Sequence, residues 1–157
     1  MTVHRYRREL AIPLADTASI QPYVLRTFRS RADVPGLHAL LQESYAARGA
    51  SLGPCDEWWQ ILSSDQEFDV RLVFLAETPA GTLAAAGIAW NSGFVKDLAV
   101  APAYRRQGLG TALMAHICRT FERQGAHAVD LKVEAGNQAA IALYEAMGMR
   151  RVETVAA

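Results

Sequence analysis

The sequence predicts a single mixed α/β domain, in which helices cover both faces of a central sheet. Strand-like and helical segments follow one another in the order β-β-α-α-β-β-β-α-β-α-β, which favours a layered architecture of sheet and helices. The length of 157 residues suits one domain, and a composition that is 51% hydrophobic and 20% charged is typical of a globular protein.

The N-terminal segment is predicted to stand somewhat apart from the rest. Residues 6–12 resemble a strand that Pro13 ends, and a turn is expected at Asp16-Thr17. Residues 1–20 are therefore interpreted as an N-terminal extension that adds a strand, and residues 21–157 as the main domain.

Apolar spacing and turn residues define the remaining elements. Asp33 is a suitable N-cap for a helix that Gly49 ends, and a second, short helix begins near Asp56. Further strands are predicted at residues 23–29, 70–77, 82–90, 94–101, 128–134 and 150–155. Further helices are predicted at residues 111–124 and 137–147, the second with Gly148 as its C′ residue.

Composition argues against several classes of function. The 16 basic and 16 acidic residues balance, which predicts neither a nucleic-acid partner nor an anionic membrane surface. The longest strongly apolar stretch, residues 83–90, is too short to span a bilayer, and no signal peptide is evident. Cys55 and Cys118 lack metal-site spacing and are interpreted as free thiols of a cytoplasmic protein, and the four histidines predict no metal site.

One segment, Arg105 to Thr111, indicates an anion site. It joins a predicted strand to a predicted helix, and backbone N–H groups at a helix start have no intrahelical acceptor and carry positive partial charge. Gly108 and Gly110 allow backbone to approach an anion closely, and Arg105 and Arg106 add charge. A nucleoside-triphosphate loop is disfavoured because no Lys follows the glycine, and a dinucleotide site because the third glycine is missing.

This segment resembles the pyrophosphate-binding signature of the GNAT superfamily of N-acetyltransferases, in which Arg or Gln is followed by two variable residues, Gly, one variable residue, and Gly or Ala. Leu98-Ala99-Val100-Ala101-Pro102 is typical of the family's fourth strand. Asn137 to Met149, about thirty residues downstream, resembles a second family motif, with Met149 where an aromatic is more common. The resemblance covers residues 70–155, extends upstream to residue 23 and leaves residues 1–20 uncovered.

The resemblance implies a mostly antiparallel central sheet with splayed fourth and fifth strands, and acetyl-CoA as cosubstrate without a metal. The pantetheine arm would lie in the splay, against the backbone of Leu98 and Val100, and one strand N–H would polarise the thioester carbonyl. The side chains themselves would pack in the core. The cofactor residues implied are Leu98, Val100, Arg105, Arg106, Gln107, Gly108, Gly110, Thr111 and Asn137.

The second motif implies a general acid. Tyr144 would protonate the departing thiolate, which suits a phenol that stays protonated at neutral pH. Asn137, two helical turns earlier, would contact the cofactor and also serve as an N-cap. Packing of the Tyr144 ring and capping by Asn137 alone remain open as alternatives, and Glu145 is interpreted as a solvated helix residue.

The general base and the acceptor are less defined. Relatives often place Glu or His two or four residues before the position of Leu98, where this chain has Lys96 and Phe94. Asp97 should face the other side of the sheet. A water relay or a carboxylate from the first helices, such as Glu43, Asp56 or Glu57, is equally open.

Three side chains are candidates for acceptor binding. Trp58 and Trp59 would form an aromatic wall, with core packing or a dimer surface as alternatives. Lys96 would attract an acidic group on the substrate, or extend to the rim of the cleft.

We therefore expect a cytoplasmic N-acetyltransferase that transfers acetyl to a primary amine of a small molecule by direct attack. A protein N-terminus, a lysine, or a charged tRNA are alternative acceptors, with the neutral charge weakening the last. A non-catalytic acyl-CoA sensor is the alternative from the binding class. A homodimer is compatible with the sequence.

Overall fold

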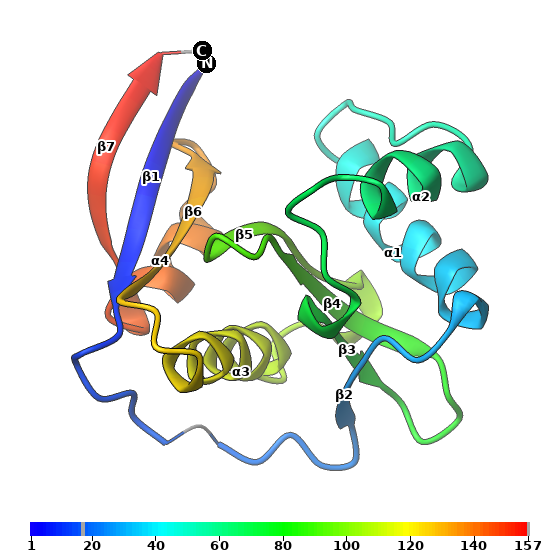
Figure 1. The fold of residues 1–157 in the computed structure, drawn as a ribbon, viewed down its shortest axis with the longest axis horizontal. Coiled ribbons are helices and arrows are strands. Elements are labelled where there is room, and N and C mark those ends of the chain that lie inside the picture. Colours follow the sequence, from blue (N-terminus) through cyan, green and yellow to red (C-terminus); the bar gives the residue numbers. More distant parts are fainter. Residues whose placement is uncertain (17, 157) are drawn as a thin grey trace.

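The computed structural model describes residues 1–16 and 18–156, and these form one open sheet with helices on both faces (Figure 1). The turn expected at Asp16-Thr17 involves Thr17, which lies outside the described residues. The strands are β1 (Thr2–Glu9), β2 (Val24–Thr27), β3 (Val73–Glu77), β4 (Leu83–Ala89), β5 (Phe94–Val100), β6 (Ala128–Glu134) and β7 (Arg150–Ala156). They are ordered β2-β3-β4-β5-β6-β1-β7, and only β5 and β6 pair in parallel.

The α-helices form two layers. Helices α1 (Val34–Ala46) and α2 (Cys55–Ser63) cover one face of the sheet, and α3 (Leu109–Arg123) and α4 (Gln138–Ala146) cover the other (Figure 1). Short 3-10 turns precede α1, β3 and α3, at Arg31–Asp33, Val70–Leu72 and Pro102–Tyr104. The expected mixed, mostly antiparallel sheet with helices on both faces is confirmed.

Strand alternation divides the core in two. Val73 and Leu75 of β3 pack with α1 and α2, whereas Phe74 and Ala76 pack beneath α3. The same alternation in β5 directs Ala99 toward α1 and Leu98 toward Ile117 of α3. The two clusters are separated by the sheet, so each face of β5 and β6 is supported independently.

The predicted N-terminal extension contains an internal strand of the sheet. β1 begins at Thr2, four residues earlier than expected, and lies between β6 and β7 with antiparallel pairing to both. Thr2 pairs with Ala156, so the two ends of the chain lie side by side (Figure 1). β7 pairs with β1 alone, and its attachment to the sheet therefore depends on the first nine residues.

The structure differs from the expected backbone contacts at the starts of α1 and β3. Asp33 occupies the N-cap position of α1, as predicted, but its side chain caps no N–H of the helix, because its carboxylate accepts hydrogen bonds from the Arg26 guanidinium at 2.7 Å and the Arg29 N–H at 2.8 Å. Residues 70–72 form a 3-10 turn rather than the start of a strand, because the Asp69 carboxylate accepts from the Arg71 N–H at 2.8 Å. In both cases the aspartate carboxylate accepts hydrogen bonds from nearby arginines and N–H groups, and these bonds replace the regular contacts expected at the start of the element.

The sheet opens between β5 and β6. These strands pair only at Phe94 with Asp130 and at Val95 with Leu131, after which they diverge. A register shift in the pairing with β4, between Ile88 and Ala89, makes Lys96 a bulge residue on β5. The splay between these strands, expected from the family resemblance, is present.

Candidate active site

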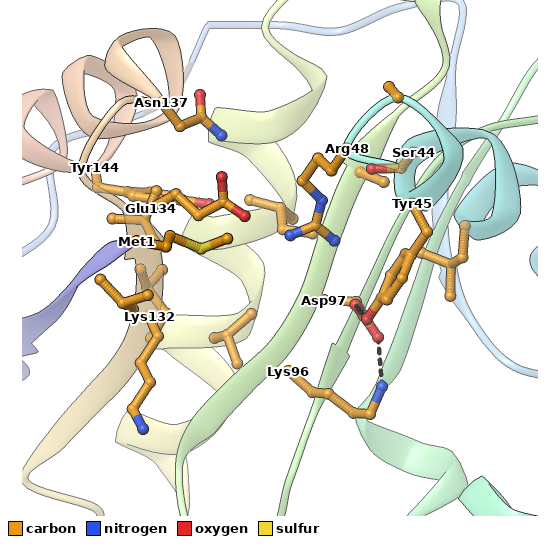
Figure 2. Close-up of a pocket in the computed structure, with 18 of the residues that line it drawn as sticks. Met1, Ser44, Tyr45, Arg48, Lys96, Asp97, Lys132, Glu134, Asn137 and Tyr144 are labelled. Atoms are coloured by element: carbon orange, nitrogen blue, oxygen red, sulfur yellow. Dashed lines mark hydrogen bonds and ion pairs between the residues drawn. The ribbon is translucent and has the colours of Figure 1, made fainter. Parts of the chain in front are cut away.

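A cleft of about 410 Å³ lies where β5 and β6 separate (Figure 2). Its walls come mainly from the two strands, the C-terminal end of α1, the N-cap of α4 and the last turn of α4. The lining residues are Leu41, Ser44, Tyr45, Ala47, Arg48, Val95, Lys96, Asp97, Leu98, Ala99, Leu131, Lys132, Val133, Glu134, Met1, Val3, Arg105, Asn137 and Tyr144.

The loop that leads from β5 into α3 presents a run of unsatisfied backbone donors. Within the described chain, the N–H groups of residues 106–111 have no hydrogen-bond acceptor, and no side chain caps α3. Arg106 and Gly108 adopt left-handed conformations, with φ of 64° and 80°. Alternating left-handed residues turn successive N–H groups into one concavity, which is an anion-binding geometry. The loop therefore presents an anion-binding concavity.

The two glycines of this loop serve different purposes. Gly108 requires a positive φ, and no atom comes closer than 4.0 Å to where its Cβ would lie. Gly110 is helical and buried, and a Cβ there would lie 3.0 Å from Leu143 Cδ1 of α4. Gly110 therefore allows α3 to pack closely against α4, which corrects the expectation that its missing side chain makes room for an anion.

The other residues of the loop are placed around this concavity. Arg105 lines the cleft and its Nε donates to the Val100 carbonyl at 3.2 Å. The Gln107 side chain accepts a hydrogen bond from the Tyr23 hydroxyl at 2.7 Å. Thr111 lies in the first turn of α3.

Tyr144, from the last turn of α4, lines the cleft. It is 8% exposed and makes no side-chain hydrogen bond within the described chain, although it lines the cavity. Burial raises the pKa of its phenol, so the group is protonated at neutral pH. The environment of Tyr144 therefore suits a proton donor.

Asn137 performs the capping role that the sequence suggests and also lines the cleft. Its side-chain oxygen accepts from the Ala140 N–H at 3.2 Å at the start of α4. Glu145 is an exposed residue of α4, as expected, and its carboxylate also accepts a hydrogen bond from the buried Tyr6 hydroxyl of β1 at 3.3 Å. The first strand thus contacts α4 one residue after Tyr144.

A carboxylate missed by the sequence argument lines the opposite wall. Asp97 does point away from Leu98, as alternation predicts, but the overhang of α1 places it in the same cleft. Its carboxylate accepts from the Tyr45 hydroxyl at 2.6 Å and from Lys96 Nζ at 2.9 Å (Figure 2). Burial, together with the Asp97 charge and the hydrogen bond to it, raises the pKa of Tyr45.

Glu134 is a second carboxylate in the cleft, on the β6 wall near Tyr144 (Figure 2). The earlier candidates for a base, Glu43, Asp56 and Glu57, do not line the cavity and are exposed. Glu134 could have been recognised, since it ends the strand that leads into the second motif. Asp97 could not, because it lines the cleft only through the packing of α1, which is distant in sequence and brings Tyr45 to its carboxylate.

The two candidate tryptophans belong to the core rather than to the cleft. Trp58 and Trp59 are 7% and 6% exposed and pack against α1, with Trp59 stacked on Phe28 at 5.0 Å between ring centroids. The hydrophobic face of α2 accounts for their burial, and the structure does not bring them to the site. Lys96 does line the cleft, but it is ion-paired with Asp97.

Over residues 1–16 and 18–156, no group of three or more His, Cys, Asp or Glu side chains is arranged to hold a metal ion. In the same residues, no helix has the length and apolar character needed to cross a membrane.

Known proteins share both the sequence pattern and the fold. A ribosomal protein bS18-alanine N-acetyltransferase from Escherichia coli K12 is 50% identical over 52 residues, which are 33% of this chain and 35% of that protein. A mycothiol acetyltransferase from Streptomyces avermitilis is 29% identical over 168 aligned residues, covering 98% of this chain and 53% of that protein.

Among solved structures, a GCN5-related N-acetyltransferase from Sphaerobacter thermophilus superimposes with a TM-score of 0.84 at 19% identity, over 98% of this chain and 49% of that one. The chain thus spans from about a third to about half of the length of these relatives. Residues 34–149 match the acetyltransferase (GNAT) family. The chain therefore belongs to the GNAT family of acetyltransferases.

Proposed function

We propose that the chain transfers an acetyl group from acetyl-CoA to a primary amine of a small molecule, by direct attack of the amine on the thioester. The observation that carries this proposal is the succession of two features along one stretch of the chain. The edge of β5 that β6 leaves unpaired at the splay is followed, past the cleft-lining Arg105, by the unsatisfied N–H groups of residues 106–111. The pyrophosphate of acetyl-CoA matches the loop of free N–H groups, and its extended, acyl-carrying pantetheine arm matches the splayed cleft.

The pyrophosphate of acetyl-CoA would lie in the loop, on the backbone N–H groups and beside Arg105 and Arg106. The pantetheine arm would enter the splay and pair with the free edge of β5, at Leu98 and Val100. The thioester would then lie near Tyr144, and a β5 N–H would polarise the developing oxyanion. Asn137 would contact the cofactor from the start of α4.

The reaction follows from these positions. The neutral amine attacks the thioester carbonyl, the carbon–nitrogen bond forms, and the tetrahedral intermediate collapses with cleavage of the carbon–sulfur bond. Tyr144 donates its proton to the departing thiolate. The proton lost by the amine passes to Asp97 or Glu134, directly or through water, because these are the carboxylates that line the described cleft.

The cleft of about 410 Å³ would hold the pantetheine arm together with the acceptor, and its acceptor side is compatible with a small-molecule amine. A protein N-terminus is the second candidate, because a bS18-alanine N-acetyltransferase is 50% identical over 52 residues. That identity extends over 33% of this chain, so the acceptor of the relative is not transferred with it. A cytoplasmic location stays a prediction from two unpaired cysteines, Cys55 and Cys118.

Binding and turnover test the proposal separately. At a concentration one hundred times its Kd, acetyl-CoA should raise the free energy of unfolding by about 2.7 kcal/mol. ATP and a nicotinamide dinucleotide serve as controls that should give no comparable shift. Release of CoA thiol with a library of primary amines then separates an enzyme from an acyl-CoA sensor. Stabilisation by ATP but not by acetyl-CoA would refute the assignment.

A further inference from the structure

Arg48 places an uncompensated positive charge in the middle of the cleft. It follows the C-terminus of α1 and reaches between Tyr45 on one wall and Glu134 on the other (Figure 2). In the described chain no carboxylate oxygen lies within 4.0 Å of its guanidinium nitrogens. By contrast, the nearby Lys96 is ion-paired with Asp97 at 2.9 Å.

The guanidinium is held in place by the wall beneath it. Its central carbon lies 4.6 Å from the centroid of the Tyr45 ring, which is a cation–π distance. Tyr45 is itself fixed, because its hydroxyl donates to the buried Asp97 at 2.6 Å. One aromatic side chain therefore orients a cation on its face and a carboxylate at its hydroxyl end.

Asp97 remains able to attract an ammonium group. A carboxylate has about four lone-pair positions, and Tyr45 and Lys96 each use one of them. The acceptor wall thus presents an unpaired cation on the face of the Tyr45 ring and a partly satisfied anion at its hydroxyl end. This arrangement is complementary to a molecule that carries charges of both signs.

We propose that the acceptor is an amine that carries an acidic group, a carboxylate or a phosphate, and that Arg48 binds this acidic group. The inference rests on the proposed acetyl transfer and specifies its substrate class. A guanidinium suits either anion, because its planar N–H groups form two parallel hydrogen bonds with a pair of oxygens. The amine would then face Asp97 and Glu134, where its proton is lost.

A purely structural role for Arg48 makes a different prediction. A cation just after a helix C-terminus interacts favourably with the helix dipole, which would stabilise α1 without any ligand. In that case replacement of Arg48 would change thermal stability and leave the discrimination between acidic and neutral acceptors unchanged. The ratio of the affinities for an acidic and a matched neutral acceptor therefore separates the two roles.

The experiment uses bisubstrate analogues, in which the sulfur of CoA is joined through a CH2–CO bridge to the nitrogen of an acceptor. One pair compares β-alanine with its amide, and a second compares 2-aminoethyl phosphate with ethanolamine. Dissociation constants are measured by titration calorimetry for the wild type, Arg48→Gln, and the control Arg31→Gln, which alters an exposed arginine that is not among the cleft-lining residues.

In at least one pair the wild type should bind the acidic conjugate about ten to a hundred times more tightly than the neutral one, since a hydrogen bond to a charged group has that strength. Arg48→Gln should reduce this ratio to about one, whereas Arg31→Gln should retain it. The pair that shows the ratio identifies carboxylate or phosphate. Equal affinities within both pairs, or a ratio that survives in Arg48→Gln, overturn this inference while leaving the proposed acetyl transfer intact. Failure of both acetyl-CoA and every conjugate to bind would overturn the proposed function as well.

Discussion

Replacing Tyr144 by Phe removes one oxygen atom from the cleft and keeps the ring that packs beneath it. The side chain is 8% exposed and its hydroxyl makes no hydrogen bond within the described chain. Loss of the hydroxyl therefore leaves no buried partner unsatisfied. We expect the free energy of unfolding to change by no more than about 0.5 kcal/mol, as for a substitution without a lost interaction.

The effect on the chemical step should be much larger. General-acid catalysis contributes roughly a hundredfold to ten-thousandfold, which corresponds to about 2.7–5.4 kcal/mol of activation free energy. The rate of acetyl transfer in Tyr144→Phe should fall by this factor, because the thiolate would then leave without a positioned proton donor. Acetyl-CoA affinity should stay near that of the wild type, since the phenol acts on the leaving group.

Single-turnover measurements with preformed acetyl-CoA complex are needed beside steady-state rates, because slow product release can hide a change in chemistry. Tyr6→Phe is a matched control. It also removes one phenol oxygen, at the hydroxyl that donates to Glu145 at 3.3 Å, but Tyr6 does not line the cleft. Tyr6→Phe should lower the free energy of unfolding and leave the single-turnover rate unchanged. If Tyr144→Phe equals the wild type in single turnover, Tyr144 is a packing residue and the proton comes from another group.

Three further predictions concern the loop, the first strand and the strand β6 that pairs with it. Arg106 has a φ of 64°, a conformation that glycine adopts without strain, so Arg106→Gly should leave the free energy of unfolding in urea unchanged or raise it by up to about 1 kcal/mol. The same variant loses a positive charge beside the loop, so titration calorimetry should show weaker acetyl-CoA binding. Arg8 is buried and donates to four carbonyls, including Met147 O at 2.8 Å. Arg8→Met leaves these carbonyls without their donor, so it should lower the free energy of unfolding by roughly 3 kcal/mol or more in the same assay. An unchanged urea midpoint would contradict this. Burial alone would raise the pKa of Asp130, but hydrogen bonds from Arg7 and Arg5 outweigh burial and lower it. The ionised Asp130 therefore contributes stability above about pH 4, and this contribution is lost as the pH falls through the lowered pKa. Asp130→Asn should flatten this part of a melting-temperature profile between about pH 7 and 3.

The parts of the site that sequence reasoning located are those encoded by consecutive residues. Residues 105–111 combine glycines, arginines and a helix start, and backbone conformation there is a local property. The same holds for Asn137, whose capping bond reaches only to Ala140. Gly148 has a φ of 86° directly after α4, as a C′ glycine should.

The parts that could not be predicted depend on partners far apart in the chain. β1 pairs with residues 128–134 and 150–156, and no pattern within Thr2–Glu9 indicates these neighbours. The bulge at Lys96 appears only in the register of β5 against β4. Gly110 looks like a phosphate-loop glycine in sequence, and its close contact with Leu143 emerges only when α3 and α4 are packed.

The position of the cleft follows from where pairing in the sheet stops. β5 is paired with β4 along one edge, but on the other edge it meets β6 only at Phe94 and Val95. Beyond them the β5 edge lacks a partner strand, and backbone groups away from water require a partner. Arg105 satisfies one of them by donating to the Val100 carbonyl at 3.2 Å.

The same strand leads, through the hydrogen-bonded 3-10 turn at Pro102–Tyr104, into the run of free N–H groups at residues 106–111. The unpaired edge of β5 and this loop are therefore two sets of unsatisfied backbone groups that one short turn separates. A ligand that has amides along its arm and phosphates at its end would satisfy both parts at once. The opposite wall stays rigid for a separate reason, since β6 pairs with β1 from Val3 to Glu9 on its far edge. The first nine residues therefore support the wall that carries Glu134, and through Tyr6 they also support the helix that carries Tyr144.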